Sequence, residues 1–253
     1  MNLNIPASMT EGLAERVCHL VEGLETPGFY KGLHIQIDLT NPQGRWELLV
    51  LAVLLAARVS ESVAETAFEA LQRHGLLDLE RMRLMRSQDT HQVGEILHGE
   101  YRGIVDRGKK AAALFANAQM LHDIYDGDLN RLYELGRTSA EVVPMLQQFK
   151  QIHTRARWLC RSMHEAGLWT DLAKDEVVFL DSHVRRALSR LGLVDNNQAW
   201  PRLKQEMYKV ITDLFDGDTT CLYRLGRYVC SVIEPETCNG QCPLRDICLY
   251  AQS

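Results

Sequence analysis

The segment LGRYVCSVIEPETCNGQCPLRDICLY, residues 225–250, carries four of the chain's seven cysteines within 19 residues. They are Cys230, Cys238, Cys242 and Cys248, spaced C-x7-C-x3-C-x5-C. Thiolates this close repel one another, so a protein whose thiols stay reduced keeps them together to hold a metal ion or cluster. The cysteine spacing is compatible with either a zinc ion or an iron–sulfur cube as the bound group. A single compact loop after a helix favours the cube over two zinc knuckles, and two disulfides are the metal-free alternative.

Outward from this loop the sequence pattern is helical nearly throughout, and we expect an all-α fold. Trp46 to Ala57 is apolar on nearly every face, which predicts a central helix. Ser62 with Glu65 predicts the N-terminal cap of the next helix. Only residues 33–39 alternate apolar and polar, as a short extended piece would. The helices are expected at 8–22, 46–57, 62–74, 90–98, 107–122, 128–136, 139–149, 154–166, 182–191, 199–215 and 218–231.

The cysteine segment resembles the cluster loop of endonuclease III and its adenine-glycosylase relatives, which are helix-hairpin-helix DNA glycosylases. In that family a Gly-Arg pair precedes the first cysteine, as Gly226 and Arg227 do here. The last cysteine follows an acidic and an apolar residue, as in Asp246-Ile247-Cys248. The first two gaps are each one residue longer than in the family, and residues 231–237 contain two acids where the family's loop is basic. The resemblance implies a [4Fe-4S] cluster on the four cysteines.

A second stretch, LDSHVRRALSRLG at residues 180–192, resembles the family segment that begins Val-Asp-Thr-His. The aspartate of that segment is the catalytic carboxylate, so the resemblance implies this role for Asp181. Breaking an N-glycosidic bond develops positive charge on the sugar, and a nearby carboxylate stabilises that charge. The structural alternative is that Asp181 only caps the helix 182–191. We interpret His183 as a packing or hydrogen-bonding residue rather than a base.

The family's DNA-contacting hairpin has the form L-P-G-V-G-x-K-T-A, and residues 149–157, FKQIHTRAR, stand at its place before Asp181. Gln151-Ile152-His153 then replaces Gly-x-Gly, and Arg155 replaces the lysine of the bifunctional members. A guanidinium stays protonated and cannot form an imine, so we expect weak or no lyase activity, with Lys150 and Lys174 as substitute amines. A plain helix-turn-helix with a solvated basic face is the structural alternative.

The net charge of −5 argues mildly against nucleic acid as a partner, but DNA binding needs only a local basic face. Three basic patches occur: residues 149–164, residues 185–190, and the group Arg102, Arg107, Lys109 and Lys110. Each is also explained as a solvated helix face. Arg58 stands where family members often place a glutamine that inserts into DNA. The expected DNA contacts are Arg58, Lys150, Gln151, His153, Thr154, Arg155, Arg157 and Arg185.

One stretch occurs twice along the chain. Residues 123–137 read DIYDGDLNRLYELGR and residues 213–227 read DLFDGDTTCLYRLGR, with nine of fifteen positions identical. Each copy predicts a helix end, a turn at glycine, an aspartate cap and a new amphipathic helix that ends in glycine. A calcium loop is the less fitting explanation, because it needs more oxygen ligands in a frame of about 12 residues.

The composition is that of an ordinary globular protein, with 46% hydrophobic and 24% charged residues among 253. The longest apolar run, Leu48 to Ala57, is ten residues, whereas a bilayer span needs about 20. No secretory signal is recognisable at the N-terminus. We therefore expect a cytoplasmic, nucleoid-associated monomer with no membrane partner. In that setting Cys18, Cys160 and Cys221 would be reduced, small buried hydrophobes.

The resemblance implies a two-lobed fold and a function in base excision repair. The first lobe, residues 45–165, would be a six-helix barrel ending in the degenerate hairpin. The second would join residues 1–44 to 166–253 and carry the cluster. The implied activity is that of a DNA N-glycosylase that removes a damaged or mismatched base from double-stranded DNA. The alternatives are a DNA-binding relative without catalysis, favoured by the lost glycines, and an iron–sulfur redox or sensor protein, slightly favoured by the net charge.

Overall fold

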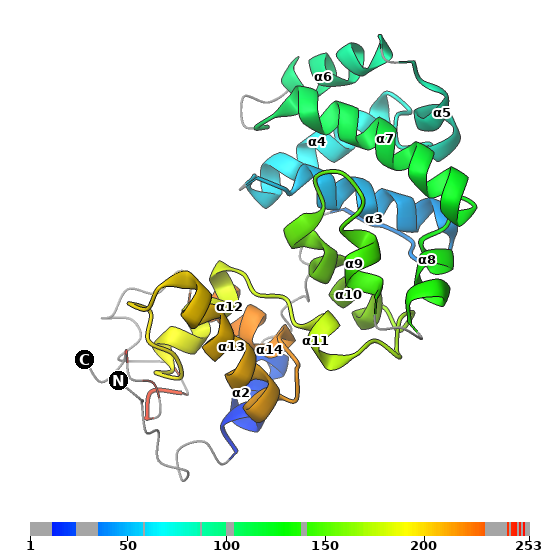
Figure 1. The fold of residues 1–253 in the computed structure, drawn as a ribbon. Helices are drawn as coiled ribbons and strands as arrows, with labels where there is room; N and C mark the ends of the chain where they lie inside the picture. Colours follow the sequence, from blue (N-terminus) through cyan, green and yellow to red (C-terminus); the bar gives the residue numbers. More distant parts are fainter. Residues whose placement is uncertain are drawn as a thin grey trace. The chain divides into compact units, whose positions relative to one another are not determined.

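A computed structural model of the chain describes residues 12–23, 35–57, 59–86, 88–99, 104–137, 141–230, 242, 244–246, 248 and 250. Every regular element in these ranges is a helix (Figure 1), which confirms the predicted all-α fold. Two compact units are present. The continuous unit is Leu33–Glu176, and the split unit joins Met1–Gly32 to Val177–Ser253. The barrel limits expected from the sequence, 45–165, stay a prediction.

The continuous unit is built around α3 (Pro42–Leu54), as the apolar pattern predicted. Asn41 caps this helix by accepting a hydrogen bond from the Gly44 amide, and every residue from Leu48 to Leu54 is fully buried. Four helices pack on α3 (Figure 1): α4 (Glu61–Arg73), α7 (Arg107–Tyr125), α8 (Leu129–Gly136) and α10 (Ala156–Glu165). A helix buried on all sides can only be the centre of such a bundle.

Shorter elements complete the continuous unit: α5 (Leu79–Leu84), α6 (Asp89–Gly99), α9 (Val142–Leu146) and the 3-10 turn η2 (His153–Arg155), with α11 (Lys174–Val177) at its end. The expected cap at Ser62 is wrong. Ser60 is the extended residue before α4, and Ser62 is already helical. Helix α5 was not expected because six residues carry too little periodicity to detect. Residues 35–38 form no strand in the described chain.

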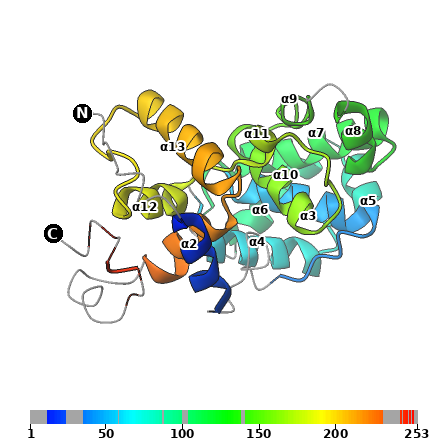
Figure 2. The same cartoon turned by 90° about the horizontal axis from the view of Figure 1, so that it is seen from below.

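The split unit brings one helix from the N-terminal part of the chain against helices from the C-terminal part. Helix α2 (Leu13–Gly23) packs on α13 (Trp200–Phe215) and α14 (Thr220–Arg224), as Figure 2 shows from below. Helix α12 (Ser182–Arg190) packs on α14 and on η3 (Leu225–Val229), a single π-helical turn that continues α14. A π-helical turn inside a helix often marks a functional position.

A disulfide joins α2 to α14 through Cys18 and Cys221, whose Cα atoms are 5.0 Å apart. The expectation that both are reduced, buried hydrophobes is therefore wrong. Pairing of residues 203 positions apart depends on the tertiary fold, which cysteine spacing does not reveal. Cys160 is the fully buried free thiol that was predicted, and burial raises its pKa far above the usual range.

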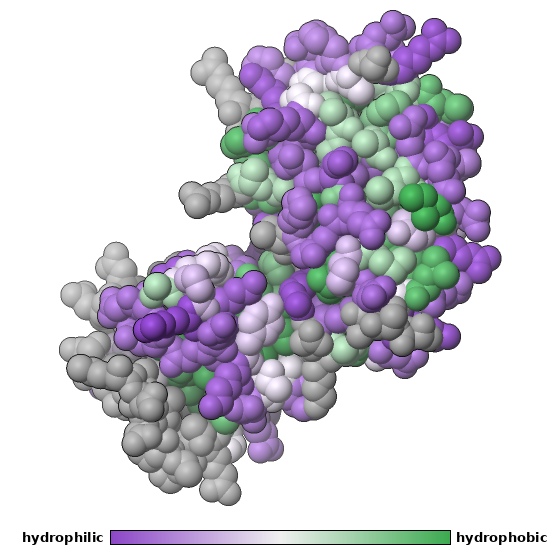
Figure 3. Space-filling view, in the orientation of Figure 1, coloured by the Kyte–Doolittle hydropathy of each residue, from purple (hydrophilic) through white to green (hydrophobic). Residues whose placement is uncertain are grey.

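None of the helices in the described ranges is long and apolar enough to cross a membrane. The face in Figure 3 mixes hydrophilic and apolar residues, and hydrophilic side chains predominate over α6. A mixed surface of this kind is ordinary for folded proteins, because apolar atoms always contribute a large part of the accessible area.

Candidate functional site

Asp181 is the N-cap residue of α12. Its Oδ1 atom accepts hydrogen bonds from the backbone amides of His183 and Val184, both at 2.8 Å. The residue has an extended backbone and a half-buried side chain, as expected of an aspartate that begins a helix. Among the described residues, Oδ2 has no hydrogen-bond donor. The cap predicted as the structural alternative is thus present, and the catalytic role of Asp181 stays a prediction.

The first turn of α12 lies directly against η3. A Cβ atom added to Gly226 would lie 1.9 Å from the backbone oxygen of His183, so the two backbones meet where only glycine fits. Arg186 closes this contact by donating from Nη1 to the Gly226 oxygen at 3.0 Å. The His183 ring packs edge-on against Tyr223, with ring centroids 5.5 Å apart, in line with a packing role. The Gly-Arg pair before the first cysteine is therefore fixed to the helix that Asp181 begins.

Three of the four expected cluster ligands are described, and Cys238 lies outside the described residues. Cys230 and Cys248 are buried, and Cys242 is half-buried. The Cys248 thiol donates to the Arg190 backbone oxygen at 3.3 Å, at the end of α12. Burial raises the pKa of Cys230 to about 11, with Cys242 and Cys248 adding to the rise and Arg190 opposing it. The described residues contain no preformed group of three metal ligands.

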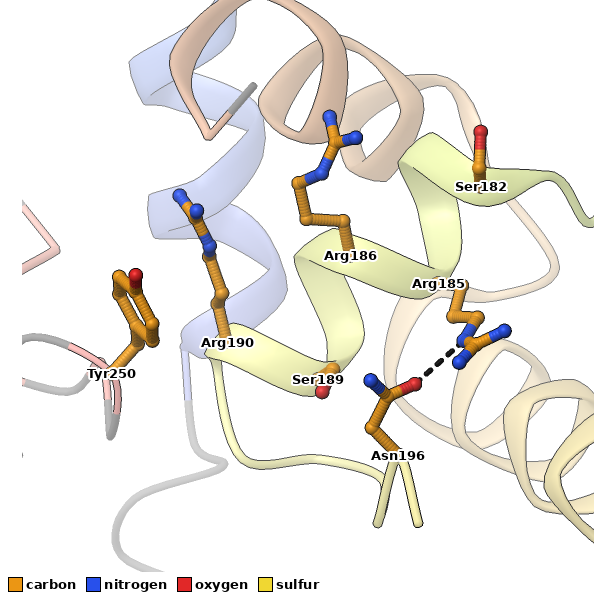
Figure 4. A pocket seen from close by; sticks show the side chains of 7 residues that line it. All are labelled: Ser182, Arg185, Arg186, Ser189, Arg190, Asn196 and Tyr250. Atoms are coloured by element: carbon orange, nitrogen blue, oxygen red, sulfur yellow. Dashed lines mark hydrogen bonds between the residues drawn. The ribbon is translucent and has the colours of Figure 1, made fainter. Parts of the chain in front are cut away.

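A pocket with three arginines in its lining lies beside α12 (Figure 4). Arg186 and Arg190 extend from the helix toward the same side, and the Arg190 guanidinium lies 4.3 Å from the centre of the Tyr250 ring. Arg185, an expected DNA contact, donates from Nε to the Asn196 side-chain oxygen at 2.6 Å. The lining residues are Ser182, Arg185, Arg186, Ser189, Arg190, Asn196 and Tyr250.

The hairpin expected at residues 149–157 connects α9 to η2 and α10. Gln151 has a φ of +63°, the left-handed conformation that glycine adopts without strain. The position expected for the family's first hairpin glycine therefore keeps a glycine-like backbone. Asn117 of α7 fixes the backbone of this turn. Its Oδ1 accepts from the Lys150 amide at 2.7 Å, and its Nδ2 donates to the Lys150 oxygen at 3.0 Å.

The other expected DNA contacts have different surroundings. Lys150 and His153 are exposed, and Arg157 is half-buried in α10. Arg155 donates from Nη2 to the backbone oxygen of Leu55 at 3.1 Å, so its guanidinium binds the end of α3. Arg58 and the side chain of Thr154 lie outside the described residues.

Two members of the expected basic patches are not on the surface. Lys110 is fully buried, and its Nζ donates to the oxygens of Val53, Leu54 and Ala56 at 2.6, 3.0 and 3.0 Å. Burial and the nearby Arg155 charge lower the pKa of Lys110 to about 8. Arg161 is buried too and pairs with Glu165 at 3.4 Å. The surface interpretation is wrong for both residues.

The roles of Lys110 and Asn117 were missed in the sequence, although a signal was present. Lys110, Leu114, Asn117, Leu121 and Tyr125 recur at spacings of three and four, the period of a buried helix face. A lysine on such a face is buried only where acceptors surround it, and the sequence did not reveal that the end of α3 supplies them.

No family model matches the sequence, and no curated protein matches it. Among the solved structures that resemble the fold are two complexes of endonuclease III with DNA. A trapped endonuclease III–DNA covalent intermediate, the estranged-adenine complex, matches with a TM-score of 0.62 and 15% identity over 96% of this chain and 97% of the other. A non-covalent endonuclease III–DNA complex matches with a TM-score of 0.55 and 16% identity over 94% and 96%. The chain therefore has an endonuclease III-like, all-α fold.

Proposed function

We propose that this protein is a DNA glycosylase that removes a damaged or mismatched base from double-stranded DNA in base excision repair. The observation that carries the proposal is the likeness to endonuclease III over nearly the full length of both chains. Both of those structures hold DNA, and one is a trapped covalent intermediate. We further propose that the protein acts as a monomer in the cytoplasm, at the nucleoid, where the Cys18–Cys221 disulfide would be an exception to the usual reduced state of thiols.

Asp181 is the catalytic residue of this proposal. Its Oδ1 is fixed by two backbone amides, which sets the orientation of the carboxylate before any substrate arrives. The carboxylate would stabilise the positive charge that develops on the sugar as the base departs. Fixed orientation matters because electrostatic stabilisation is most effective when the group need not reorganise during the reaction.

Arg155 supports the proposal that the enzyme performs no lyase step. An imine to the opened sugar requires a neutral amine, and a guanidinium does not provide one. The Arg155 guanidinium is also engaged with the Leu55 oxygen at the end of α3. We therefore propose a monofunctional enzyme whose contacts to DNA include Lys150, Gln151, His153, Arg157 and Arg185, together with Arg58 and Thr154.

We also propose that Cys230, Cys238, Cys242 and Cys248 hold a [4Fe-4S] cluster. Two observations support this proposal: two of the three described thiols are buried, and both Cys242 and Cys248 add to the raised pKa of Cys230, as nearby thiols do. When bound, the cluster would supply a cross-link within the split unit and one-electron redox chemistry. Anaerobically purified protein should contain about four irons per chain. One zinc and no iron would exclude the cluster.

The test of the glycosylase compares Asp181→Asn with Asp195→Asn on a panel of duplexes with modified or mismatched bases. Both aspartates accept a hydrogen bond from a nearby backbone amide, and both lie in the split unit. Asp181→Asn keeps the size and the capping ability of the side chain but removes the charge. We expect its excision rate to fall by about 10²–10³, while Asp195→Asn excises like wild type.

Product analysis separates the proposed activity from its alternatives. Wild type should leave an abasic strand that breaks only after hot alkali, and borohydride should trap no protein–DNA adduct. A strong adduct would mean that another amine, such as Lys150, performs a lyase step. Equal excision rates for Asp181→Asn and wild type would mean that Asp181 only caps α12 and has no catalytic role. DNA binding without excision on every duplex would favour the DNA-binding relative.

A further inference from the structure

Helix α7 carries two buried polar side chains on one face. Lys110 is 0% and Asn117 is 1% exposed, and they stand among Ala113, Leu114 and Leu121. Seven residues separate them, which places them two turns or about 10 Å apart along the helix axis. Burying an ammonium and an amide is unfavourable unless each is fully hydrogen-bonded. The side-chain nitrogen and oxygen atoms of both residues all make hydrogen bonds, and each residue binds backbone atoms of a different segment.

Lys110 holds the C-terminal end of α3. Its three hydrogen bonds go to the oxygens of Val53, Leu54 and Ala56, and the Leu55 oxygen accepts from Arg155. Helix ends leave backbone oxygens without intrahelical partners and carry partial negative charge, so two cations suit this position. Ala57 follows in the left-handed conformation, with a φ of +59°. The end of α3 is thus fixed by side chains from two other elements.

Asn117 holds the hairpin in the same way. It binds both backbone groups of Lys150, and Gln151 next to it has a φ of +63°. A non-glycine residue in this conformation costs about 1 kcal/mol or more, so the turn needs support from outside itself. Arg155, which follows the hairpin, reaches the Leu55 oxygen at the end of α3. The α3 end, α7 and the hairpin therefore form one hydrogen-bonded frame.

We propose that the turn at Leu55–Ala57 and the hairpin at Lys150–Ile152 both meet the DNA duplex and that α7 sets their spacing, with Lys110 and Asn117 as the positioning residues. This inference rests on the proposed function. Apolar packing alone tolerates sliding between elements, whereas hydrogen bonds to named backbone atoms fix where each segment stands. A frame built before binding avoids the entropic cost of ordering the two segments on the duplex.

The frame should matter for recognising a lesion more than for general affinity. Non-specific binding depends on the number of cations near phosphates, and this number hardly changes when a buried lysine is replaced. Lesion recognition requires two segments to meet the duplex at a set separation, and small displacements weaken such contacts strongly. The preference for damaged over intact duplex is therefore the quantity that Lys110 and Asn117 control.

The experiment compares Lys110→Met with Lys109→Met, the same change one residue apart. The Lys109 side chain is 70% exposed and pairs with Asp106 at 3.5 Å. The probe is a duplex with a tetrahydrofuran abasic analogue opposite 2-aminopurine, whose fluorescence rises on unstacking, and its intact counterpart. Wild type and Lys109→Met should prefer the abasic duplex and raise its fluorescence. Lys110→Met should lose about tenfold or more of this preference and give no fluorescence rise.

Asn117→Leu is the second variant, and it decides the matter if Lys110→Met does not fold, because it keeps Lys110 and its three hydrogen bonds to the end of α3. It should lose the preference while keeping salt-dependent binding to intact duplex. If folded variants keep both the preference and the fluorescence rise, the inference is overturned while the proposed function stands. If wild type binds neither duplex at low salt, the proposed function fails and the inference with it.

Discussion

The two copies of the repeated stretch, residues 123–137 and 213–227, fold the same turn in two different units. Asp126 and Asp216 both have a φ of +51°, and Gly127 and Gly217 follow at +76° and +81°. In each copy the glycine amide donates to an oxygen six residues earlier, at 3.0 and 3.1 Å. Each helix therefore ends in two successive left-handed residues, an aspartate and then a glycine.

In both copies the next aspartate accepts a hydrogen bond from the helix that follows the turn. Asp128 caps α8 by accepting from the Asn130 amide at 2.9 Å, and Asp218 accepts from the Thr220 amide at 2.7 Å. Asp128 also binds the buried Arg45 through both of its oxygens, at 2.6 and 2.8 Å. One repeated residue thus combines a local cap with a long-range ion pair in the continuous unit.

The helix that follows the turn also contacts different residues in the two copies. Tyr133 stacks on Trp169 at 5.2 Å between ring centres, whereas Tyr223 packs edge-on against His183. Beyond them, Gly136 faces side chains of α9, and Gly226 faces the backbone of α12. The repeated residues fix the turn, and the surroundings decide whether the helix after it supports a core or holds the segment that carries Asp181.

The largest effect should come from Cys221, which stands where the first copy has Arg131. Cys221→Ser removes a disulfide that joins residues 203 positions apart, so we expect the free energy of unfolding to fall by about 5 kcal/mol. Arg131→Ser removes only an exposed pair with Glu134 and should change it by under about 1 kcal/mol. Urea denaturation measures both. A reductant should bring wild type to the level of Cys221→Ser, and unchanged stability of that variant would contradict the prediction.

The next effect concerns the long-range role of Asp128. Asp128→Asn keeps the cap but leaves the Arg45 guanidinium, 4% exposed, without its counter-charge, so we expect a loss of about 3 kcal/mol. Asp78→Asn is the matched control, because Asp78 caps α5 through the Arg81 amide at an exposed position. We expect the free energy of unfolding of Asp78→Asn to fall by under about 1 kcal/mol. Similar losses for both variants would show that the ion pair contributes little.

The smallest difference in stability should be that between substitutions of Gly226 and Gly136, the glycines that end the two copies. A Cβ at Gly226 would meet the His183 backbone oxygen at 1.9 Å, whereas one at Gly136 would first meet the Val142 side chain at 2.9 Å. A side chain can shift more easily than the backbone of a helix turn. We expect Gly226→Ala to cost about 3 kcal/mol and Gly136→Ala about 1 kcal/mol in denaturation. The reverse order would mean that η3 can move away from α12.

The turn in each copy was predictable because it depends on neighbouring residues alone. Gly127 and Asp128 adopted the predicted turn and cap, and Asp181 adopted the predicted cap of α12. The central position of α3 followed from its uniform apolar character. All three features are determined within a few residues of chain.

Features that depend on distant residues were not predictable in the same way. Lys110 follows another lysine and looked like part of a basic surface, and only the end of α3 explains its burial. The Cys18–Cys221 pair needs α2 and α14 side by side. The resemblance did indicate a hairpin at residues 149–157, but the left-handed Gln151 and its support from Asn117 became visible only in the structure.

The split unit also sets an order of assembly during synthesis. Helix α2 leaves the ribosome long before α13 and α14, against which it packs, whereas every residue of the continuous unit has emerged before Val177. Because domains fold as units while the chain grows, the hairpin and its α7 frame should be complete first. A nascent or C-terminally truncated chain would then display the hairpin without Asp181 or the clustered thiols.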